Sequence, residues 1–418
     1  MRADRAIRVV LAGWLLMAAG CAFGPKMLEK TRLRYNRAVK CTSEEQLLLN
    51  IVRLRYTDTP SSLGVSNIAA QHELQQTLGV VPFFTSAASN FDIATAATVL
   101  PQVSFEGATR PTITYTPEDD QEFTRKLFTP MSLEGIVFLT KTVGTWPVST
   151  VMRLWLETLN RVDNAQTASG PTPALPPTFA EFRTGIDALQ TLQDRNQVVV
   201  FVKEIEEKVG GAAPAANVTP RHIIEAAKGG FEYRPDPDGK TWSLVKKKDQ
   251  PELHLNPEAL HSPEGQLFVE TFHLKPGLKV YPLKSGKIDP FAVNFPAEGV
   301  ETLDLEPRSL LQVLYYVSKG VEVPPEHVQN GVVMMTVDAA GVSFDWSQVT
   351  ENLFTVHWAK GCKRPKCAHV AVCYMGYWFY IDETDQPTKS TFSLLMELSR
   401  LQLGSKSGGG PVVTLPLH

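Results

Sequence analysis

Soft metal ligands gather toward the C-terminal end of the chain, at Cys362, Cys367, His369 and Cys373, with His357 a short way upstream. Thiolates and imidazoles suit zinc, but this spacing matches no common zinc ribbon or finger. Residues 363–366 are instead typical of a turn between two strands, which would bring Cys362 and Cys367 within disulfide distance. We therefore predict a Cys362–Cys367 disulfide and no metal site, with zinc as the alternative.

A second pattern that could carry chemistry is Ser243-Leu-Val-Lys246, which fits Ser-x-x-Lys. It lies on a predicted hairpin strand and lacks the partner motifs of the enzymes that use it, so we expect no catalysis there. The chain also lacks a Gly-x-Ser-x-Gly elbow, a His-Glu-x-x-His helix, a Walker loop and a dinucleotide fingerprint. We therefore predict no catalytic residues and no cofactor.

Acidic and aromatic residues follow the cysteines. Residues 382–385 (DETD) lack the glycine and the spaced ligands of a calcium loop, so we interpret them as a solvated turn before a helix. Strand alternation places Tyr377 and Phe379 on one face and Trp378 and Tyr380 on the other. We expect one face to be core, and the other to be available to a ligand.

The N-terminus is typical of an export signal. Residues 1–20 combine three arginines with a short apolar run and end in small residues directly before Cys21. This stretch resembles the lipobox of bacterial lipoproteins, which implies that Cys21 carries a lipid, palmitate included, and becomes the mature N-terminus. Ala22 favours the outer membrane by the same resemblance. The alternatives are an ordinary secretory signal with a chance cysteine, or an uncleaved anchor.

Bulk properties narrow the class of protein. The chain has 418 residues, of which 43% are hydrophobic and 20% charged, as in a globular protein. A net charge of −3 argues against nucleic acid as a partner. No apolar run of about 18 residues follows the signal, so we expect membrane contact through the lipid on Cys21. Export also favours paired cysteines, and Cys41 and Cys373 either pair or stay free.

The pattern of helix and strand signals predicts an α+β fold, multi-lobed, with helices packed on mainly antiparallel sheets. We divide the chain into a signal peptide (1–20), a basic tether (21–41), an N-terminal α+β lobe (42–163), a Pro-rich linker (164–178), a middle α+β region (179–290) and a C-terminal sheet-and-helix lobe (291–418).

Several local predictions concern the first half of the chain. A capping box at Thr42 would open a helix. Strands are expected at 62–69, 94–105 and 110–115, with an exposed loop at 79–90. Helices are expected at 122–128, from Ser132 to Val143, and from Trp146-Pro147 to Leu159.

Further local predictions concern the second half of the chain. Residues 231–234 and 241–246 are predicted to form a hairpin across a Pro-Asp-Pro-Asp-Gly turn. Residues 332–337, 341–346, 353–358, 368–374 and 377–381 would make an antiparallel series. A closing helix capped by Thr388 would bury Phe392 and Leu395, and residues 411–417 would add an edge strand.

Four stretches resemble an uncharacterised family of lipoproteins of Gram-negative bacteria. They are residues 50–56 (NIVRLRY) with Asp58 and Pro60, Thr129-Pro130, residues 320–327 (GVEVPPEH) and residues 379–392 (FYIDETDQPTKSTF). The resemblance spans nearly the whole mature chain. It supports a location in the envelope and implies no particular activity.

We therefore expect a lipid-anchored periplasmic or outer-membrane lipoprotein. Its expected partners are envelope proteins, and its expected role is that of a non-enzymatic binding or assembly component of an envelope complex. The alternative is an envelope hydrolase whose site is assembled from distant residues. Convergent Ser, His or carboxylate groups in a pocket would favour the hydrolase.

Overall fold

The computed structural model describes residues 23–61, 63–89, 92–117, 121–140, 146–286 and 298–403. It divides into two compact units: residues 1–46 with 61–120, and residues 47–60 with 121–418. The predicted signal, the lipidation site Cys21 and the expected edge strand at 411–417 lie outside the described residues.

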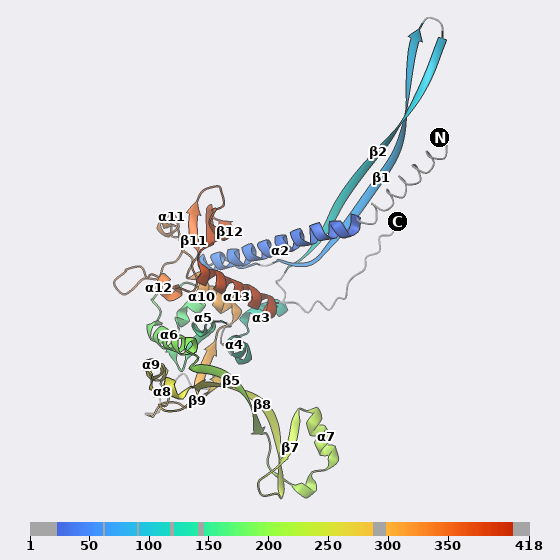
Figure 1. Cartoon of the computed structure of the whole chain (residues 1–418). Helices are drawn as coiled ribbons and strands as arrows, with labels where there is room; N and C mark the ends of the chain where they lie inside the picture. The colour runs from blue at the N-terminus through green and yellow to red at the C-terminus, as the bar shows by residue number, and fades with distance from the viewer. Residues whose placement is uncertain are drawn as a thin grey trace. The chain divides into compact units, whose positions relative to one another are not determined.

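The first unit contains one long antiparallel hairpin, β1 (Leu63–Ser89) and β2 (Asp92–Pro117), drawn as a ribbon of two strands in Figure 1. Its register runs from Leu63 opposite Pro117 to Ser89 opposite Asp92, with one irregularity near Val65. The predicted loop at 79–90 is therefore wrong, because residues 79–89 belong to β1. Cross-strand pairing supplies backbone partners that the local glycine and proline content does not reveal.

Helix α2 (Phe23–Arg55) continues from the predicted tether into the predicted first helix. Thr42 is not an N-cap, because its hydroxyl lies in mid-helix and donates to the carbonyl of Ala38 at 2.9 Å. Back-bonding of this kind is the usual alternative for a threonine whose helix extends upstream. The helix ends at Arg55, and Thr57 then takes a positive φ of 59°.

The second unit is built on a large mixed sheet. Within the described residues it has eight strands, ordered β4-β3-β10-β9-β8-β5, with β6 and β7 also paired to β8. The pairing is antiparallel except between β9 and β10. The strands are β3 (Leu156–Leu159), β4 (Val162–Asp163), β5 (Val198–Lys208), β6 (Ala213–Pro214), β7 (Phe231–Pro235), β8 (Thr241–Leu255), β9 (Val280–Ser285) and β10 (Leu303–Pro307).

Helices pack on this sheet and on one another. Helix α6 packs against α5 and α9 and contacts β4 and β5, while α10 packs against α3 and α5. The helices are α3 (Gln121–Phe128), α4 (Leu133–Thr140), α5 (Val148–Trp155), α6 (Ala180–Asp194), α7 (Pro220–Lys228), α8 (Pro257–His261), α9 (Pro263–Thr271), α10 (Leu310–Ser318), α11 (Pro325–Gln329), α12 (Ser347–Thr350) and α13 (Gln386–Leu403), with 3-10 turns η1 (Gln166–Ser169) and η2 (Ala215–Asn217). The predicted α+β class is confirmed.

A three-stranded antiparallel sheet, ordered β11-β13-β12, lies in the same unit; its strands are β11 (His357–Lys360), β12 (Ala368–Tyr374) and β13 (Tyr377–Asp382). Met375 and Gly376 form the turn between β12 and β13, with both residues at positive φ. Tyr377 and Phe379 face the core, as alternation predicted. The strands predicted at 332–337 and 341–346 are wrong, because they are reduced to one bridge between Val337 and Ser343.

The hairpin predicted for residues 231–234 and 241–246 is confirmed, because β7 pairs with β8 across the Asp236 to Gly239 turn. Upstream of this hairpin, the Thr219 side chain caps α7. The helix expected to reach Leu159 instead ends at Trp155, and β3 follows it directly. Pairing of β3 with β10 replaces the helical hydrogen bonds there, which the local pattern alone did not indicate.

The interior of the second unit is one continuous apolar cluster that includes Trp155, Phe182, Phe379, Phe392 and Leu395. Phe392 and Leu395 are 2% and 0% exposed, so the predicted core role of α13 is confirmed. Among the described helices, none is both long enough and apolar enough to span a bilayer.

Candidate anion-binding site

A small pocket of about 190 Å³ lies in the second unit, between the end of α2, the segment that follows α10 and the residues around Trp346. It is smaller than the roughly 300–1,000 Å³ of pockets that enclose whole drug-sized ligands. Two cationic residues line it, Arg55 from α2 and Lys319 directly after α10. The pocket therefore suits one small polar group rather than a complete large molecule.

Both cations are almost fully buried, with Arg55 3% and Lys319 2% exposed. They share a hydroxyl: Arg55 Nη1 and Lys319 Nζ donate to Thr172 Oγ1 at 3.0 and 3.4 Å. Lys319 Nζ also donates to the Gly170 carbonyl at 3.0 Å, and Arg55 Nη1 donates to the Met334 carbonyl at 3.2 Å. The shared hydroxyl holds two like charges close together in the interior of the protein.

Neither cation forms an ion pair with a carboxylate among the described residues. Two carboxylates line the same pocket, but Glu322 pairs with His357 Nδ1 at 2.9 Å and Asp345 accepts from the backbone N–H of Ser347 at 2.9 Å. Arg55 Nε is buried and has no hydrogen-bond partner in the described part of the chain. An unpartnered buried donor of a cation is costly, and an anionic ligand would relieve that cost.

The pKa values of the two cations reflect their burial in the pocket. Burial, together with the nearby charge of Arg55, lowers the pKa of Lys319 to about 7. Burial also lowers the pKa of Arg55 to about 10. Both shifts mean that burial disfavours the charged forms of the two side chains, and an anion bound beside them would favour those charged forms again.

The backbone beside Lys319 packs closely against residues 354–356. A Cβ added to Gly320 would lie 2.2 Å from the Phe354 carbonyl oxygen, so a larger residue would not fit there. The Val356 N–H donates to the Gly320 carbonyl at 3.0 Å, and the Glu322 N–H donates back to the Val356 carbonyl at 2.9 Å. This close pairing orients Lys319 at the end of α10.

An aromatic and polar cluster lies next to the pocket residues in the chain. Tyr56 hydrogen-bonds His327 Nδ1 at 2.7 Å, and its ring packs edge-on against His327 and Phe379. Glu326 accepts from Tyr377 and pairs with Lys360. Tyr56, His327 and Phe379 thus bring together three stretches that the sequence analysis singled out, residues 50–56, 320–327 and 379–392.

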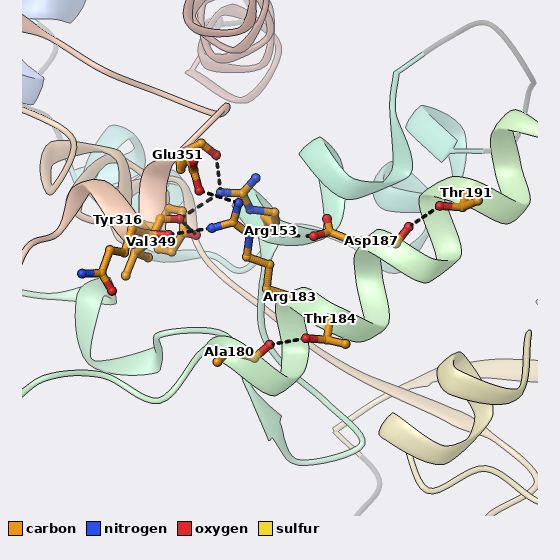
Figure 2. Close-up of polar contacts among 10 residues, drawn as sticks. Arg153, Ala180, Arg183, Thr184, Asp187, Thr191, Tyr316, Val349 and Glu351 are labelled. Atoms are coloured by element: carbon orange, nitrogen blue, oxygen red, sulfur yellow. Dashed lines mark hydrogen bonds and ion pairs between the residues drawn. The ribbon is translucent and has the colours of Figure 1, made fainter. Parts of the chain in front are cut away.

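Two other arginines of the second unit, Arg153 and Arg183, donate to protein groups around α12. Figure 2 shows Arg153 of α5 donating to the carbonyls of Val349 and Glu351, both at 2.9 Å. Arg183 of α6 donates to the Gln348 carbonyl at 2.9 Å and to the Glu351 carboxylate at 2.8 Å. These contacts fasten the α12 segment to α5 and α6, which is a structural role.

Arg308 is also structural, although it is fully buried. Its Nε donates to Ser169 Oγ at 2.8 Å, its Nη1 to the Leu156 carbonyl at 2.5 Å, and its Nη2 to the Asn164 carbonyl. Its guanidinium also stacks on the Tyr316 ring at 4.3 Å. All three nitrogens of Arg308 are used, whereas Nε of Arg55 is not.

The predicted cysteine bridge is absent from the structure. Cys362 and Cys367 are exposed and unpaired, as are Cys41 and Cys373. The disulfide therefore stays a prediction for the exported protein. Among the described residues, no group of three or more His, Cys, Asp or Glu side chains is arranged to hold a metal ion.

The weaker sequence candidates have local roles. Ser243 is buried and donates to Asp236 Oδ2 at 2.7 Å, so it stabilises the hairpin turn. Asp385 accepts from the Thr388 N–H at 3.1 Å and from its hydroxyl at 2.6 Å, at the start of α13. Helix α13 begins at Gln386, ahead of the predicted cap Thr388.

Sequence reasoning missed the two pocket cations. Arginine and lysine are exposed by default, and nothing local distinguishes these two from the others in the chain. Arg55 does lie within residues 50–56, and Lys319 directly precedes residues 320–327. Their position in or beside two stretches that the sequence analysis singled out was the available signal.

Comparisons with known proteins gave no match. No protein-family model matches the chain, and no curated protein or solved structure is significantly similar to it.

Proposed function

We propose that this protein is a lipid-anchored, non-enzymatic binding component of the bacterial cell envelope, and that its pocket receives a small oxyanion group of a partner. A carboxylate and a phosphate share the required chemistry. The observation that carries the proposal is the pair of buried cations, Arg55 and Lys319, which line one pocket without a carboxylate partner among the described residues. The location in the envelope rests on the lipobox at Cys21.

Size and charge support an end group as the ligand. About 190 Å³ accommodates one carboxylate or phosphate with a short stem, and the rest of the partner would stay outside. Arg55 Nε offers a free donor, and Lys319 Nζ offers the second charge. Recognition of a terminal carboxylate by buried donors is a known mode of peptide capture.

Titration of the purified full chain with inorganic phosphate and with acetate tests the proposal. Trp346 is a suitable fluorescent reporter, because Lys319 Nζ lies 5.7 Å from its ring centroid. We expect binding in the wild type at about millimolar concentration, and its loss in Arg55→Met and in Lys319→Met. Arg195→Met is the matched control, since Arg195 is exposed and pairs with Glu264 on the surface.

The pH dependence gives a second, independent readout. Because an anion favours the charged lysine, affinity should fall as the pH rises through about 7. Equal binding by wild type and both variants, or no binding of either anion, would contradict the proposal. Turnover of ester or amide substrates that depends on Lys319 would instead support the envelope hydrolase, since a neutral buried lysine can act as a base.

A further inference from the structure

The hairpin of β1 and β2 is far longer than ordinary strands. β1 has 27 residues and β2 has 26, which at about 3.4 Å per residue corresponds to roughly 90 Å. In the described part of the chain the two strands form a sheet of their own, so each has one unpaired edge. An isolated two-stranded ribbon is marginal in water, and this length requires another source of stability.

The register sorts the residue types of the hairpin onto two faces. Alternate positions of a strand share a face, and directly opposite residues share it too. One face takes Leu78, Val80, Pro82 and Phe84 of β1 opposite Val103, Pro101, Val99 and Ala97 of β2. Every one of these positions holds an apolar residue type.

The charged residues of the hairpin lie mainly near its base. Near its base, the opposite face takes Gln71, Glu73 and Gln75 opposite Arg110, Ala108 and Glu106. Beyond that point, residues 76–89 and 92–105 contain Asp92 as their one acidic or basic residue, and Asp92 lies at the tip. We call residues 76–89 and 92–105 the distal hairpin.

The distal hairpin has the dimensions of a strand pair that spans a membrane. A tilted strand crosses the hydrocarbon layer with about 9–11 residues, and each strand of the distal hairpin exceeds this. The opposite face in the same stretch takes Gly79, Val81 and Phe83 of β1 opposite Gln102, Leu100 and Thr98 of β2, so it is only partly apolar. Alternation between an apolar face and a less apolar face is the sequence pattern of strands that contact lipid on one side.

From this we propose that the distal hairpin inserts into a lipid bilayer, as part of an intermolecular sheet made of the hairpins of several copies of this chain. Other copies are required because lipid offers no hydrogen-bond partners to an exposed strand edge. The same hairpin in a neighbouring copy presents a complementary edge of equal length. This inference goes beyond the proposed anion binding and does not depend on it.

Prolines interrupt the edges without abolishing them. Pro82, Pro101 and Pro111 each lack an N–H, and all three lie at register positions of one face. In an antiparallel pair such positions are all of one hydrogen-bonding type. Proline is tolerated at the non-hydrogen-bonded type, where the missing donor would belong to an outer edge. The other outward positions keep their donors, and the prolines disfavour random edge pairing in water.

Lipid contact is tested by single cysteines labelled with an NBD fluorophore. The background replaces Cys41, Cys362, Cys367 and Cys373 with serine, and its signal without an added cysteine is subtracted. The full chain is reconstituted into vesicles of phosphatidylethanolamine and phosphatidylglycerol that carry a lipid-attached quencher. We expect strong quenching at Val80→Cys and Phe84→Cys, and weaker quenching at Gly79→Cys and Thr85→Cys on the other face.

A charge substitution provides the matched comparison. Val80→Lys on the apolar face should lower insertion at least about tenfold, whereas Thr77→Lys on the other face should lower it less. Uniform quenching at all four labelled positions, or none at any, would overturn the lipid-contacting face. An emission shift without quenching would overturn it in favour of a protein partner on that face.

The intermolecular sheet is tested by the mass of the detergent-solubilised protein. Analytical ultracentrifugation should give several copies for the full chain and one copy after residues 63–117 are replaced by a short Gly-Ser linker. A monomeric full chain would overturn the sheet, even if the labels are quenched. An unchanged oligomer in the linker variant would also overturn it, because the copies would then associate elsewhere.

Discussion

The hydroxyl of Tyr56 lies 2.7 Å from Nδ1 of His327, and this hydrogen bond joins the residue after α2 to helix α11. Both side chains are buried, at 8% and 7% exposure. Burial raises the pKa of Tyr56, so its hydroxyl stays protonated at physiological pH and available as a donor. The bond connects two stretches that are 271 residues apart in the sequence and flank the pocket cations.

Tyr56→Phe should lower the free energy of unfolding by about 1–3 kcal/mol, because it leaves the buried His327 nitrogen without its partner. Chemical denaturation measures this directly. Tyr315→Phe is the control: Tyr315 packs on the same core, and the described residues show no hydrogen bond to its hydroxyl. A loss of equal size in the control would mean that packing, and not the hydrogen bond, matters at Tyr56.

Lys319 should make stability depend on pH. The pKa of Lys319 falls from its ordinary value of 10.5 to about 7 on folding, so between these values the unfolded chain binds more protons. The free energy of unfolding should therefore rise from pH 7 toward 10.5, by on the order of 1.4 kcal/mol for each pKa unit of the shift.

Lys319→Met should remove this rise and stabilise the protein below pH 7, by on the order of 1–4 kcal/mol. Denaturation curves across the pH range, compared between the two proteins, isolate the contribution of Lys319 from other titrating groups. Lys240→Met serves as an exposed control. Parallel pH profiles for wild type and Lys319→Met would show that burial does not disfavour the charged form of Lys319.

Truncation of the α13 core residues should be costly. Phe392→Ala or Leu395→Ala should lose about 2–5 kcal/mol through lost burial and an unfilled cavity, and the second unit should become sensitive to protease. Ser393→Ala, at an exposed position of the same helix, should melt like the wild type. Thermal melts and limited proteolysis test both expectations, and unchanged melting of the core variants would refute them.

The exported protein should form the Cys362–Cys367 bridge. The loop that it closes is short, so its contribution should be at or below about 2–3 kcal/mol. Both thiols are exposed and therefore accessible to oxidants. Non-reducing peptide mapping of periplasmic material checks the bridge, and free thiols at both positions or stoichiometric zinc by elemental analysis would exclude it.

Cys21→Ala should abolish lipidation and leave the chain unprocessed or soluble in the periplasm. Membrane fractionation with detection of the N-terminus measures the result. A Cys21→Ala chain that is still cleaved directly before residue 21 would contradict the lipobox, wherever the chain is found. The distal hairpin is a second route of membrane contact, and a double variant with Val80→Lys should lose both routes.

Local patterns in the sequence were enough to predict many individual elements. The β7–β8 hairpin follows from its Pro-Asp-Pro-Asp-Gly turn. Alternation in β13 and the apolar arc of α13 predicted which side chains are buried, Phe379 and Phe392 among them. These predictions held because turn conformation, capping and amphipathic periodicity depend on residues close together in the chain.

Features that depend on residues far apart in the sequence could be seen only in the tertiary structure. Residues 79–89 form a strand because β2 lies opposite them, although their glycine and proline content indicates a loop. Arg55 and Lys319 look like ordinary surface residues in the sequence. Folding buries both beside Thr172 and brings their charges together in one pocket. Burial and electrostatic environment are properties of the assembled core, and a local pattern contains no information about them.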